Sequence, residues 1–384
     1  MSEPREIVAT YLVETDKPKE ALNAICRGQT VGNPNILTHY ETQDFLNKWC
    51  ANGKFNGFTS PFAMKVRFPD KNFGAEGISY LLSVLMGGQC DIDIIKGCRL
   101  IDINLGSFTR HFSKPRYGLN GIRSRLGVLH RPLLCGIIKP KIGLTPKQLT
   151  EVVKQMIDGG CDVIKEDEIL SNQFWCPMDK RLDLLAPLLQ ESSSLYLTCI
   201  TADGSEAWKR ARRVASYGDH FGVHCNLWAG LGTLRDIRDH AEVPLFFQKS
   251  GDKVWTTGNY SIDYTVICEL LNLIGCDFAH VGMYGGYMAE PVEELRKRIL
   301  ALKNTIPSFS CGMTPSIAEQ TIARFDSNIM LTVGGWIHGQ QEGVESAVKK
   351  MRQAIETCSV QNREVQEGLD NRQLQTSVVH NNPI

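Results

Sequence analysis

A regular alternation of strand-like and helix-like stretches runs through the chain from about residue 134. The predicted strands cover 134–141, 162–167, 195–201, 221–227, 244–249, 278–282, 307–311 and 329–334. The predicted helices between and after them lie near 145–158, 178–190, 204–217, 230–239, 261–274, 289–303, 314–324 and 340–357. Eight strand–helix units match an α/β fold of the (β/α)8 TIM-barrel type in number and length. A doubly wound open sheet is the alternative, and the count of eight favours the barrel.

The residues before the barrel follow a different plan. Two strands and three helices are predicted there, at Ile7–Val13, Phe62–Phe68, Lys17–Arg27, Gly77–Leu85 and Gly118–Leu126. We therefore expect a smaller α+β domain of ferredoxin-like type over residues 1–125 and the barrel over 126–358. Residues 359–384 are rich in Gln, Asn and charge without apolar periodicity, which predicts a disordered tail.

Composition argues against several classes of partner. Lys plus Arg and Asp plus Glu number 42 each, so no basic face indicates nucleic acid and no cationic amphipathic segment indicates a membrane. No apolar run reaches the roughly 18 residues of a spanning helix, and the first residues contain no signal-peptide apolar segment. The 13 cysteines are scattered singly without C-x-x-C, as expected of small core residues rather than disulfide or zinc ligands. These features predict a cytoplasmic protein.

Polar side chains and glycines fall at one end of almost every predicted strand. In a (β/α)8 barrel the reactive groups gather at the C-terminal ends of the strands. In chain order these ends carry Lys139 and Lys141, then Lys165, Asp167 and Glu168, then His224 and Asn226, Gln248 and Lys249, His280, Ser310 to Gly312, and Gly334 with Gly335. The active site is therefore expected at this end of the barrel.

The end of the second predicted strand has the spacing of a metal site. Residues two apart on a strand share a face, so Lys165 and Asp167 point the same way and Glu166 points to the other face. Glu168 follows at the strand exit, where its side chain can turn back. Two carboxylates suit a hard divalent ion such as Mg²⁺. Lys165 becomes a ligand when CO₂ adds to its neutral amine to give a carbamate. A simple Lys–Asp ion pair is the alternative, and this strand alone leaves both open.

The loops after the last two predicted strands are candidates for phosphate binding. Ser310 and Gly312 follow one strand, and Gly334 and Gly335 follow the other, each just before a predicted helix. Backbone N–H groups of such turns bind phosphate, and this is the usual phosphate position in barrels. An ordinary strand–helix loop is the alternative, and the position after the last two strands favours phosphate.

At this point the chain resembles the RuBisCO large-chain family, and more closely its RuBisCO-like proteins (form IV). The string from Gly136 to Gly143 is similar to the lysine motif of that family's first barrel strand, and the string from Gly159 to Glu168 is similar to its second. Residues 30–32 and 117–123 resemble the methionine-salvage enolase branch. The order of elements agrees along the chain short of the tail.

The resemblance implies a role for each motif residue. Lys165 would be carbamylated and would bind one Mg²⁺ per subunit with Asp167 and Glu168. Lys139 and Lys141 would be catalytic, polarising a carbonyl or moving a proton.

The same resemblance implies contacts with the substrate. Ser310, Gly312, Gly334 and Gly335 would bind its 1-phosphate. His280 would face the substrate, with a satisfied core histidine as the alternative, and Lys249 would meet its distal end or stay solvated. The family pattern further implies a homodimer in which the N-terminal domain of one subunit covers the barrel mouth of the other.

Departures from the family pattern limit the expected reaction. The carboxylases carry a mobile lysine on the loop after the sixth strand, whereas residues 282–288 contain none. Their His–Arg pair after the fifth strand is replaced by Gln248 and Lys249. Losing the lysine removes several kcal/mol of transition-state stabilisation, so carbon dioxide fixation is not expected. Enolisation remains, because it needs only a divalent ion and a lysine base.

The expected activity is therefore that of an isomerase, a keto–enol tautomerase. The favoured substrate is a small phosphorylated ketone, 2,3-diketo-5-methylthiopentyl-1-phosphate of methionine salvage. The enolase branch, however, has a lysine where this chain has Gly88, and lacks Lys141. A 5-methylthioribulose-1-phosphate isomerase or another sugar-phosphate enolising enzyme is the nearest alternative. A catalytically inactive, metabolite-binding regulator is the alternative from another class, and the intact Lys165 cluster argues against it.

Two further residues, in or directly after the predicted phosphate loops, are expected to have structural roles. His338 follows the second loop and is expected to hold it in shape. Cys311 lies inside the first loop, where a small filler is favoured over a reactive thiol.

Overall fold

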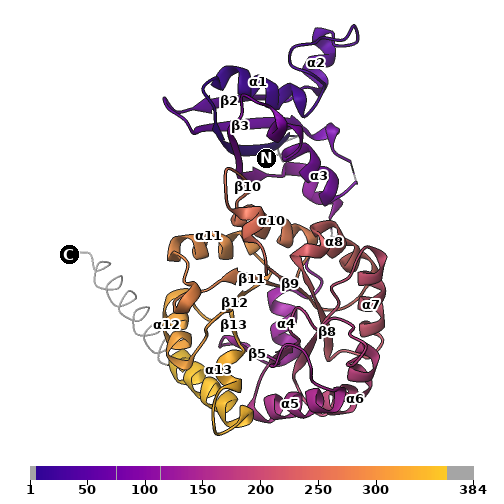
Figure 1. The fold of residues 1–384 in the computed structure, drawn as a ribbon, viewed down its shortest axis with the longest axis vertical. Helices are drawn as coiled ribbons and strands as arrows, with labels where there is room; N and C mark the ends of the chain where they lie inside the picture. The colour runs from indigo at the N-terminus through magenta and orange to yellow at the C-terminus, as the bar shows by residue number, and fades with distance from the viewer. Residues whose placement is uncertain (1–5, 75, 113, 361–384) are drawn as a thin grey trace, which may run out of the picture.

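Two bodies of secondary structure make up the described chain, which comprises residues 6–74, 76–112 and 114–360 of a computed structural model. The first is a five-stranded sheet in the order β10-β4-β1-β3-β2, and the second is a closed barrel in the order β11-β12-β13-β5-β6-β7-β8-β9 (Figure 1). The α/β fold with a (β/α)8 barrel and a smaller N-terminal α+β unit is confirmed.

All eight predicted barrel strands are present, and neighbouring strands pair in parallel. The strands are β5 (Leu133–Ile137), β6 (Val163–Lys165), β7 (Leu195–Cys199), β8 (Phe221–Asn226), β9 (Leu245–Gln248), β11 (Phe278–Gly282), β12 (Ile306–Phe309) and β13 (Met330–Val333). Their helices are α5 (Pro146–Gly159), α6 (Met178–Gln190), α7 (Ser205–Ala215), α8 (Leu231–His240), α10 (Tyr264–Ile274), α11 (Val292–Leu302), α12 (Pro315–Phe325) and residues 344–360. Short helices in the loops are η4 (Leu227–Ala229), α9 (Lys253–Thr256), η5 (Gly286–Met288) and α13 (Gly335–His338).

The first barrel helix illustrates how local sequence sets these bounds. At the start of α5, Thr145 and Gln148 form a capping box, and Pro146 occupies the first turn, where its missing N–H costs nothing. Gly160 ends the helix with φ 96°, a left-handed conformation that favours glycine. The residues Leu149, Val153 and Met156 recur at helical spacing and are buried.

The N-terminal sheet is built around its central strand β1. The elements before the barrel are β1 (Glu6–Glu14), α1 (Pro18–Gly28), α2 (Gln43–Trp49), β2 (Asn52–Asn56), β3 (Phe62–Pro69), η1 (Asp70–Asn72), α3 (Ile78–Leu85), η2 (Gly88–Asp91), β4 (Gly97–Asn104) and η3 (Gly106–His111). Strand β1 pairs antiparallel with β3 and β4. The sequence predicted β1, β3, α1 and α3, but not β2, β4 or α2.

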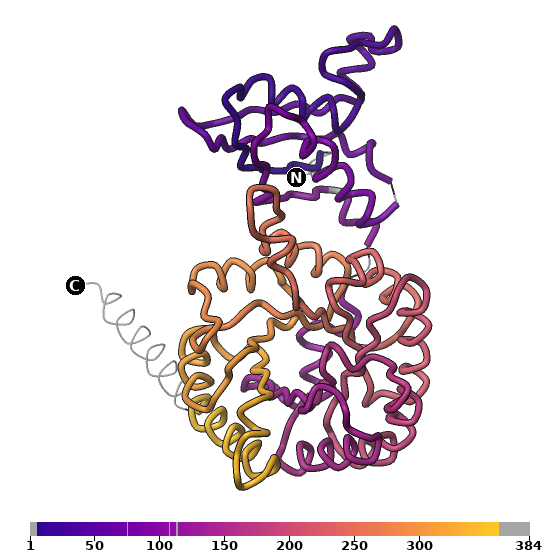
Figure 2. Tube along the Cα trace, viewed as in Figure 1, coloured from indigo at the N-terminus to yellow at the C-terminus, as the bar shows by residue number. Residues whose placement is uncertain are grey.

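The fifth strand of this sheet comes from the barrel. Strand β10 (Tyr260–Ile262) lies in the connection between β9 and α10 and pairs in parallel with Cys98–Leu100 of β4. Figure 2 shows this connection rising from the barrel to the N-terminal sheet. Backbone hydrogen bonds from Cys98 N to Asn259 O and from Asp263 N to Leu100 O extend the pairing, both at 2.8 Å. The two bodies therefore share a sheet.

One end of the barrel is closed by α4 (Gly118–Leu126). Ile122 and Leu126 of this helix, followed by Val128, pack with apolar side chains from inside the barrel, including Leu133 and Phe278. In Figure 1 the helix appears inside the ring of strands. The helix thus belongs with the barrel, because the barrel interior completes its apolar face. The sequence had placed it in the domain that ends at residue 125.

The last described helix runs through residue 360, and Ser359 is buried in it. The remainder of the predicted tail, residues 361–384, lies outside the described residues. Within the ranges that are described, no helix is long and apolar enough to cross a membrane.

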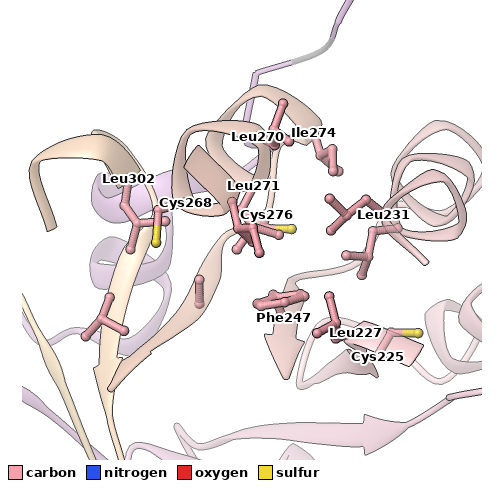
Figure 3. Close-up of a cluster of buried hydrophobic side chains, with 14 of the residues drawn as sticks. Cys225, Leu227, Leu231, Phe247, Cys268, Leu270, Leu271, Ile274, Cys276 and Leu302 are labelled. Carbon is pink, nitrogen blue, oxygen red and sulfur yellow. The ribbon is translucent and has the colours of Figure 1, made fainter. Parts of the chain in front are cut away.

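The cysteines are core residues, as expected from their apolar surroundings. All 13 are free, and nine are buried. Figure 3 shows Cys225, Cys268 and Cys276 among leucine and phenylalanine side chains where α8 and α10 pack on the strands.

A buried carboxylate ties α4 to the barrel wall. Asp277, which precedes β11, accepts hydrogen bonds from Tyr117 N (3.0 Å) and Gly118 N (2.9 Å) through Oδ1. Its Oδ2 accepts from Leu245 N (2.9 Å) and from Arg238 Nη2 (2.6 Å). Because Asp277 and Arg238 are both buried, neither charge has water as an alternative partner.

We expect Asp277→Ala to lower the free energy of unfolding by about 3–5 kcal/mol, because it leaves Arg238 buried and unpaired. Urea denaturation followed by circular dichroism measures the change. Asp239→Ala removes an exposed pair with Arg235 and serves as the control, with an expected loss below about 1 kcal/mol. Equal losses in the two variants would contradict the role of Asp277.

Candidate active site

A cavity of about 510 Å³ opens at the C-terminal ends of the barrel strands. The predicted site residues that line it are Lys139, Lys141, Asp167, Glu168, Lys249, His280, Ser310, Gly312, Gly334 and Gly335. Lys165 is absent from the lining because its side chain is fully buried. Placing the functional groups at the C-terminal ends of the strands therefore identified cavity residues that are up to 196 positions apart in sequence.

The side chains of β6 and its exit alternate as the spacing predicted. Glu166 points to the outer face, where its Oε1 lies 2.7 Å from Arg181 Nε and 2.6 Å from the Tyr196 hydroxyl. Its Oε2 accepts from Cys199 N at 2.8 Å. Glu166 is thereby satisfied away from the cavity, and Lys165 and Asp167 are left on the inner face.

The environment of Lys165 makes its charged form less favourable than it is in water. The residue is fully buried, and its Nζ donates one hydrogen bond, to Glu166 O at 3.1 Å. The Nζ also lies 5.5 Å from the ring centroid of Phe246. Burial lowers the pKa of Lys165, against the opposing pull of Glu168. A neutral amine is the form that adds CO₂.

Two lysines from the exit of β5 face the carboxylates. Lys139 Nζ lies 2.5 Å from Asp167 Oδ2, and Lys141 Nζ lies 4.0 Å from Asp167 Oδ1 and 3.8 Å from Glu168 Oε1. The close ion pair at this strand end is thus Lys139–Asp167, across two strands. Burial opposes ionisation of Glu168, but the charges of Lys165 and Lys141 and local hydrogen bonds outweigh it and lower its pKa to about 2.

Asp167 and Glu168 fit a divalent metal ion when a third anionic ligand joins them. Across the described ranges, no three His, Cys, Asp or Glu side chains gather where they could hold a metal. Asp167 and Glu168 supply two oxygen donors, and Lys165 adjoins them. A third anionic oxygen ligand arises here when Lys165 carries a carbamate. The donor set therefore fits Mg²⁺ together with CO₂, and does not fit a His- or Cys-rich metal site.

The two glycine loops face the cavity from β12 and β13. Cys311 and Gly312 have φ of 94° and 84°, so their backbone is left-handed. A Cβ on Gly334 would lie 3.2 Å from Lys139 Cε, so a side chain there would crowd the lysine. Burial raises the pKa of the Cys311 thiol, which agrees with a loop filler rather than a reactive thiolate.

Two candidates have partners that explain their positions. His338 Nε2 lies 3.0 Å from Ile137 O and 3.2 Å from Lys139 N, so His338 supports the exit of β5 rather than the second phosphate loop that it was expected to hold. Lys249 lies 3.3 Å from Glu290 and 3.4 Å from Asp252. Its charge is therefore balanced inside the protein, and it is not the solvated lysine that the sequence allowed.

The buried histidines of β11 and β8 differ in their hydrogen bonds. His280 Nε2 lies 3.1 Å from Gln248 Oε1, and burial, followed by repulsion from Lys165, lowers the His280 pKa to about 3. Both ring nitrogens of His224 are buried without a hydrogen-bond partner, and its pKa falls well below the usual range for the same two reasons. Asn226 caps the turn after β8 through Trp228 N.

Several cavity residues were not predicted from the sequence. They are Ile137, Ser250, Gly251, Asp252, Lys253, Gly282, Met283, Tyr287, Met288 and Glu290. Most of them follow β9 and β11, so extending the search from the strand ends into these two loops would have found them. Met283, Tyr287 and Met288 give the cavity an apolar side.

Comparisons with known proteins agree with this geometry. The family model of the ribulose bisphosphate carboxylase large chain, catalytic domain, matches residues 118–296. A ribulose bisphosphate carboxylase of Methanosarcina barkeri is 30% identical in an alignment of 350 positions that covers 82% of this chain and 81% of that protein. A 2,3-diketo-5-methylthiopentyl-1-phosphate enolase of Geobacillus thermodenitrificans is 28% identical in an alignment of 385 positions that covers 92% of this chain and 92% of that protein.

Among solved structures, the octameric ribulose-1,5-bisphosphate carboxylase/oxygenase of Pyrococcus horikoshii has the same fold. The TM-score is 0.86 at 22% identity, and the match covers 99% of this chain and 95% of that one. Sequence and fold lead to one conclusion, that this chain belongs to the RuBisCO large-chain family.

Proposed function

We propose that this protein is an isomerase that catalyses metal-dependent keto–enol tautomerisation of a small phosphorylated ketone, and does not fix carbon dioxide. One observation carries the proposal. The cavity holds Asp167 and Glu168 opposite two lysines, while the loop after β11 contributes Met283, Tyr287 and Met288 and contains no lysine. The groups for enolisation are therefore present, and the cation that would direct CO₂ is missing from this loop.

The metal proposed for this cavity is one Mg²⁺ per subunit. Asp167, Glu168 and a carbamate on Lys165 would hold it. When bound, Mg²⁺ supplies a Lewis acid that acidifies the C–H next to the ketone carbonyl and stabilises the charge that enolisation develops.

We assign different catalytic roles to Lys139 and Lys141. We assign the proton transfer to Lys139, whose side chain is 25% exposed, lines the cavity and lies 2.5 Å from Asp167. Lys141 is 50% exposed and within 4.0 Å of Asp167, where its ammonium polarises the carbonyl that becomes the enol. The reverse assignment remains the alternative that the variants below separate.

The remaining cavity walls suit the two ends of a 1-phosphate ketone. Ser310, Gly312, Gly334 and Gly335 would bind the phosphate through loop N–H groups. A methylthio end would meet the apolar side, where sulfur–aromatic contact with Tyr287 is favourable. These features, with the 28% identity to an enolase of that name over 92% of both chains, support 2,3-diketo-5-methylthiopentyl-1-phosphate as the substrate.

A second candidate, a 5-methylthioribulose-1-phosphate isomerase or another sugar-phosphate enolising enzyme, is favoured by two departures. Gly88 replaces the enolase lysine, and Lys141 is retained. Gly88 lies in η2 of the N-terminal sheet, outside the cavity lining. A catalytically inactive regulatory protein is the remaining alternative.

We further propose that the protein is a cytoplasmic homodimer with a shared site. In the part of the chain that the structure describes, the residues lining this cavity all lie between Ile137 and Gly335. The described residues of the N-terminal body therefore do not line it, and we propose that another subunit supplies the N-terminal contribution.

Incubation of 2,3-diketo-5-methylthiopentyl-1-phosphate in D₂O with the protein, Mg²⁺ and bicarbonate should exchange the hydrogen next to the reacting carbonyl. Proton NMR follows the exchange. Chelation of the metal or Lys165→Ala should abolish it, because chelation removes the metal and the substitution removes one of its proposed ligands. Absence of exchange with this substrate and with a panel of 1-phosphate ketoses would overturn the enolising function and favour the regulator.

Lys139→Met should slow this exchange by about 100-fold or more, as expected for loss of a proton-transferring group. Lys141→Met should raise KM and lower kcat while exchange remains measurable. The same NMR assay compares the two variants, and their thermal melting curves control for folding. Exchange that survives in Lys139→Met but disappears in Lys141→Met would reverse the assignment.

The pH dependence of exchange should show no step near 6.5 from His280. Burial holds the pKa of this residue at about 3, so it stays neutral throughout pH 5–8 and charges only below that range. The rate profile of His280→Gln should therefore keep the shape of the wild-type profile. An acidic limb near pH 6.5 that vanishes in this variant would contradict a neutral His280.

A further inference from the structure

A chain of hydrogen bonds crosses the site from β11 to the exit of β6. His280 Nε2 lies 3.1 Å from Gln248 Oε1. Gln248 Nε2 donates to Ser250 Oγ at 2.7 Å, and Ser250 Oγ donates to Glu168 Oε1 at 3.1 Å. The chain therefore ends on one of the two cavity carboxylates.

Donor and acceptor roles along this chain are fixed from the carboxylate backwards. Ser250 has a single hydroxyl hydrogen, which goes to Glu168, so its oxygen accepts from the amide of Gln248. The carbonyl oxygen of that amide then faces His280, which must carry its proton on Nε2. Gln248 and His280 are 6% and 3% exposed, so water cannot readily replace a lost partner.

The hydrogen-bond chain ends on Glu168, whose side-chain direction is not set by a barrel strand. Strand β6 ends at Lys165, so Glu168 lies three residues beyond the strand and has no ladder position to set its direction. Lys141 approaches the same Oε1, but at 3.8 Å it is a looser contact than the hydroxyl of Ser250. With Oε1 occupied by Ser250, Oε2 is the oxygen left to face a cation.

We propose that Gln248 and Ser250 are positioning residues that hold Glu168 in the orientation required to bind the divalent ion. The inference rests on the proposed metal site and adds two residues that do not themselves contact the metal. Carboxylate ligands are commonly held by such outer hydrogen bonds, and losing one lowers metal affinity or activity by about 10–100-fold.

The test is a titration of the full-length protein with Mn²⁺ in bicarbonate buffer, followed by electron paramagnetic resonance of the free ion. Ser250→Ala should weaken Mn²⁺ binding about 10-fold or more. Ser250→Thr keeps the hydroxyl and should restore the affinity. Gln248→Met should weaken binding less, because Ser250 can still donate to Glu168.

Ser261→Ala is the matched control. Ser261 of β10 is buried, whereas Ser250 is partly buried, and the Ser261 hydroxyl donates to a backbone oxygen, Gly258 O, at 3.2 Å outside the cavity lining. It should leave Mn²⁺ affinity unchanged. In a connected chain, the double variant of Gln248 and Ser250 should bind no more weakly than Ser250→Ala alone.

Each result decides a different claim. Wild-type protein that binds no Mn²⁺ would overturn the proposed metal site, and the positioning role with it. Wild-type binding that is unchanged in Ser250→Ala, or weakened equally in Ser261→Ala, would overturn the positioning role alone. Fully additive losses in the double variant would also overturn it, because independent effects are what separate structural damage would produce.

Discussion

The buried ion pair between Glu166 and Arg181 sets the direction of Lys165, the functional side chain of β6. Both residues are fully buried, and Tyr196 and the backbone of Cys199 complete the partners of the carboxylate. A charge held this way cannot turn inward without losing several hydrogen bonds at once. Because strand side chains alternate, this outward glutamate commits Lys165 to the barrel interior.

Because Lys165 points inward, the barrel interior changes from apolar to polar along its axis. The end closed by α4 is apolar, as barrel interiors usually are. Towards the cavity, Lys165 lies near His224 and His280, and Ser308 pairs with Thr332 at 2.7 Å. The two histidines have lowered pKa values, so they add no positive charge beside the lysine.

Sequence reasoning recovered most of the elements that position the site. It found all eight barrel strands because short, buried parallel strands are dense in apolar residues and are punctuated by helices. It missed β2, whose residues are mostly exposed, and β4. It could not find β10, since three residues become a strand only when β4 lies beside them. It placed α4 in the wrong body, because its apolar face is ambiguous until the barrel closes over it.

For the site, the sequence by itself determined that the polar residues at the strand ends come together, since parallel strand ends converge in a closed barrel. It also determined the inward direction of Lys165 and Asp167 from a period of two. The tertiary structure decided how they pair. It joined Lys139 to Asp167 at 2.5 Å, and it connected Glu168 to Ser250 across the barrel mouth. Such contacts depend on distances between loops of different strands, which no local pattern encodes.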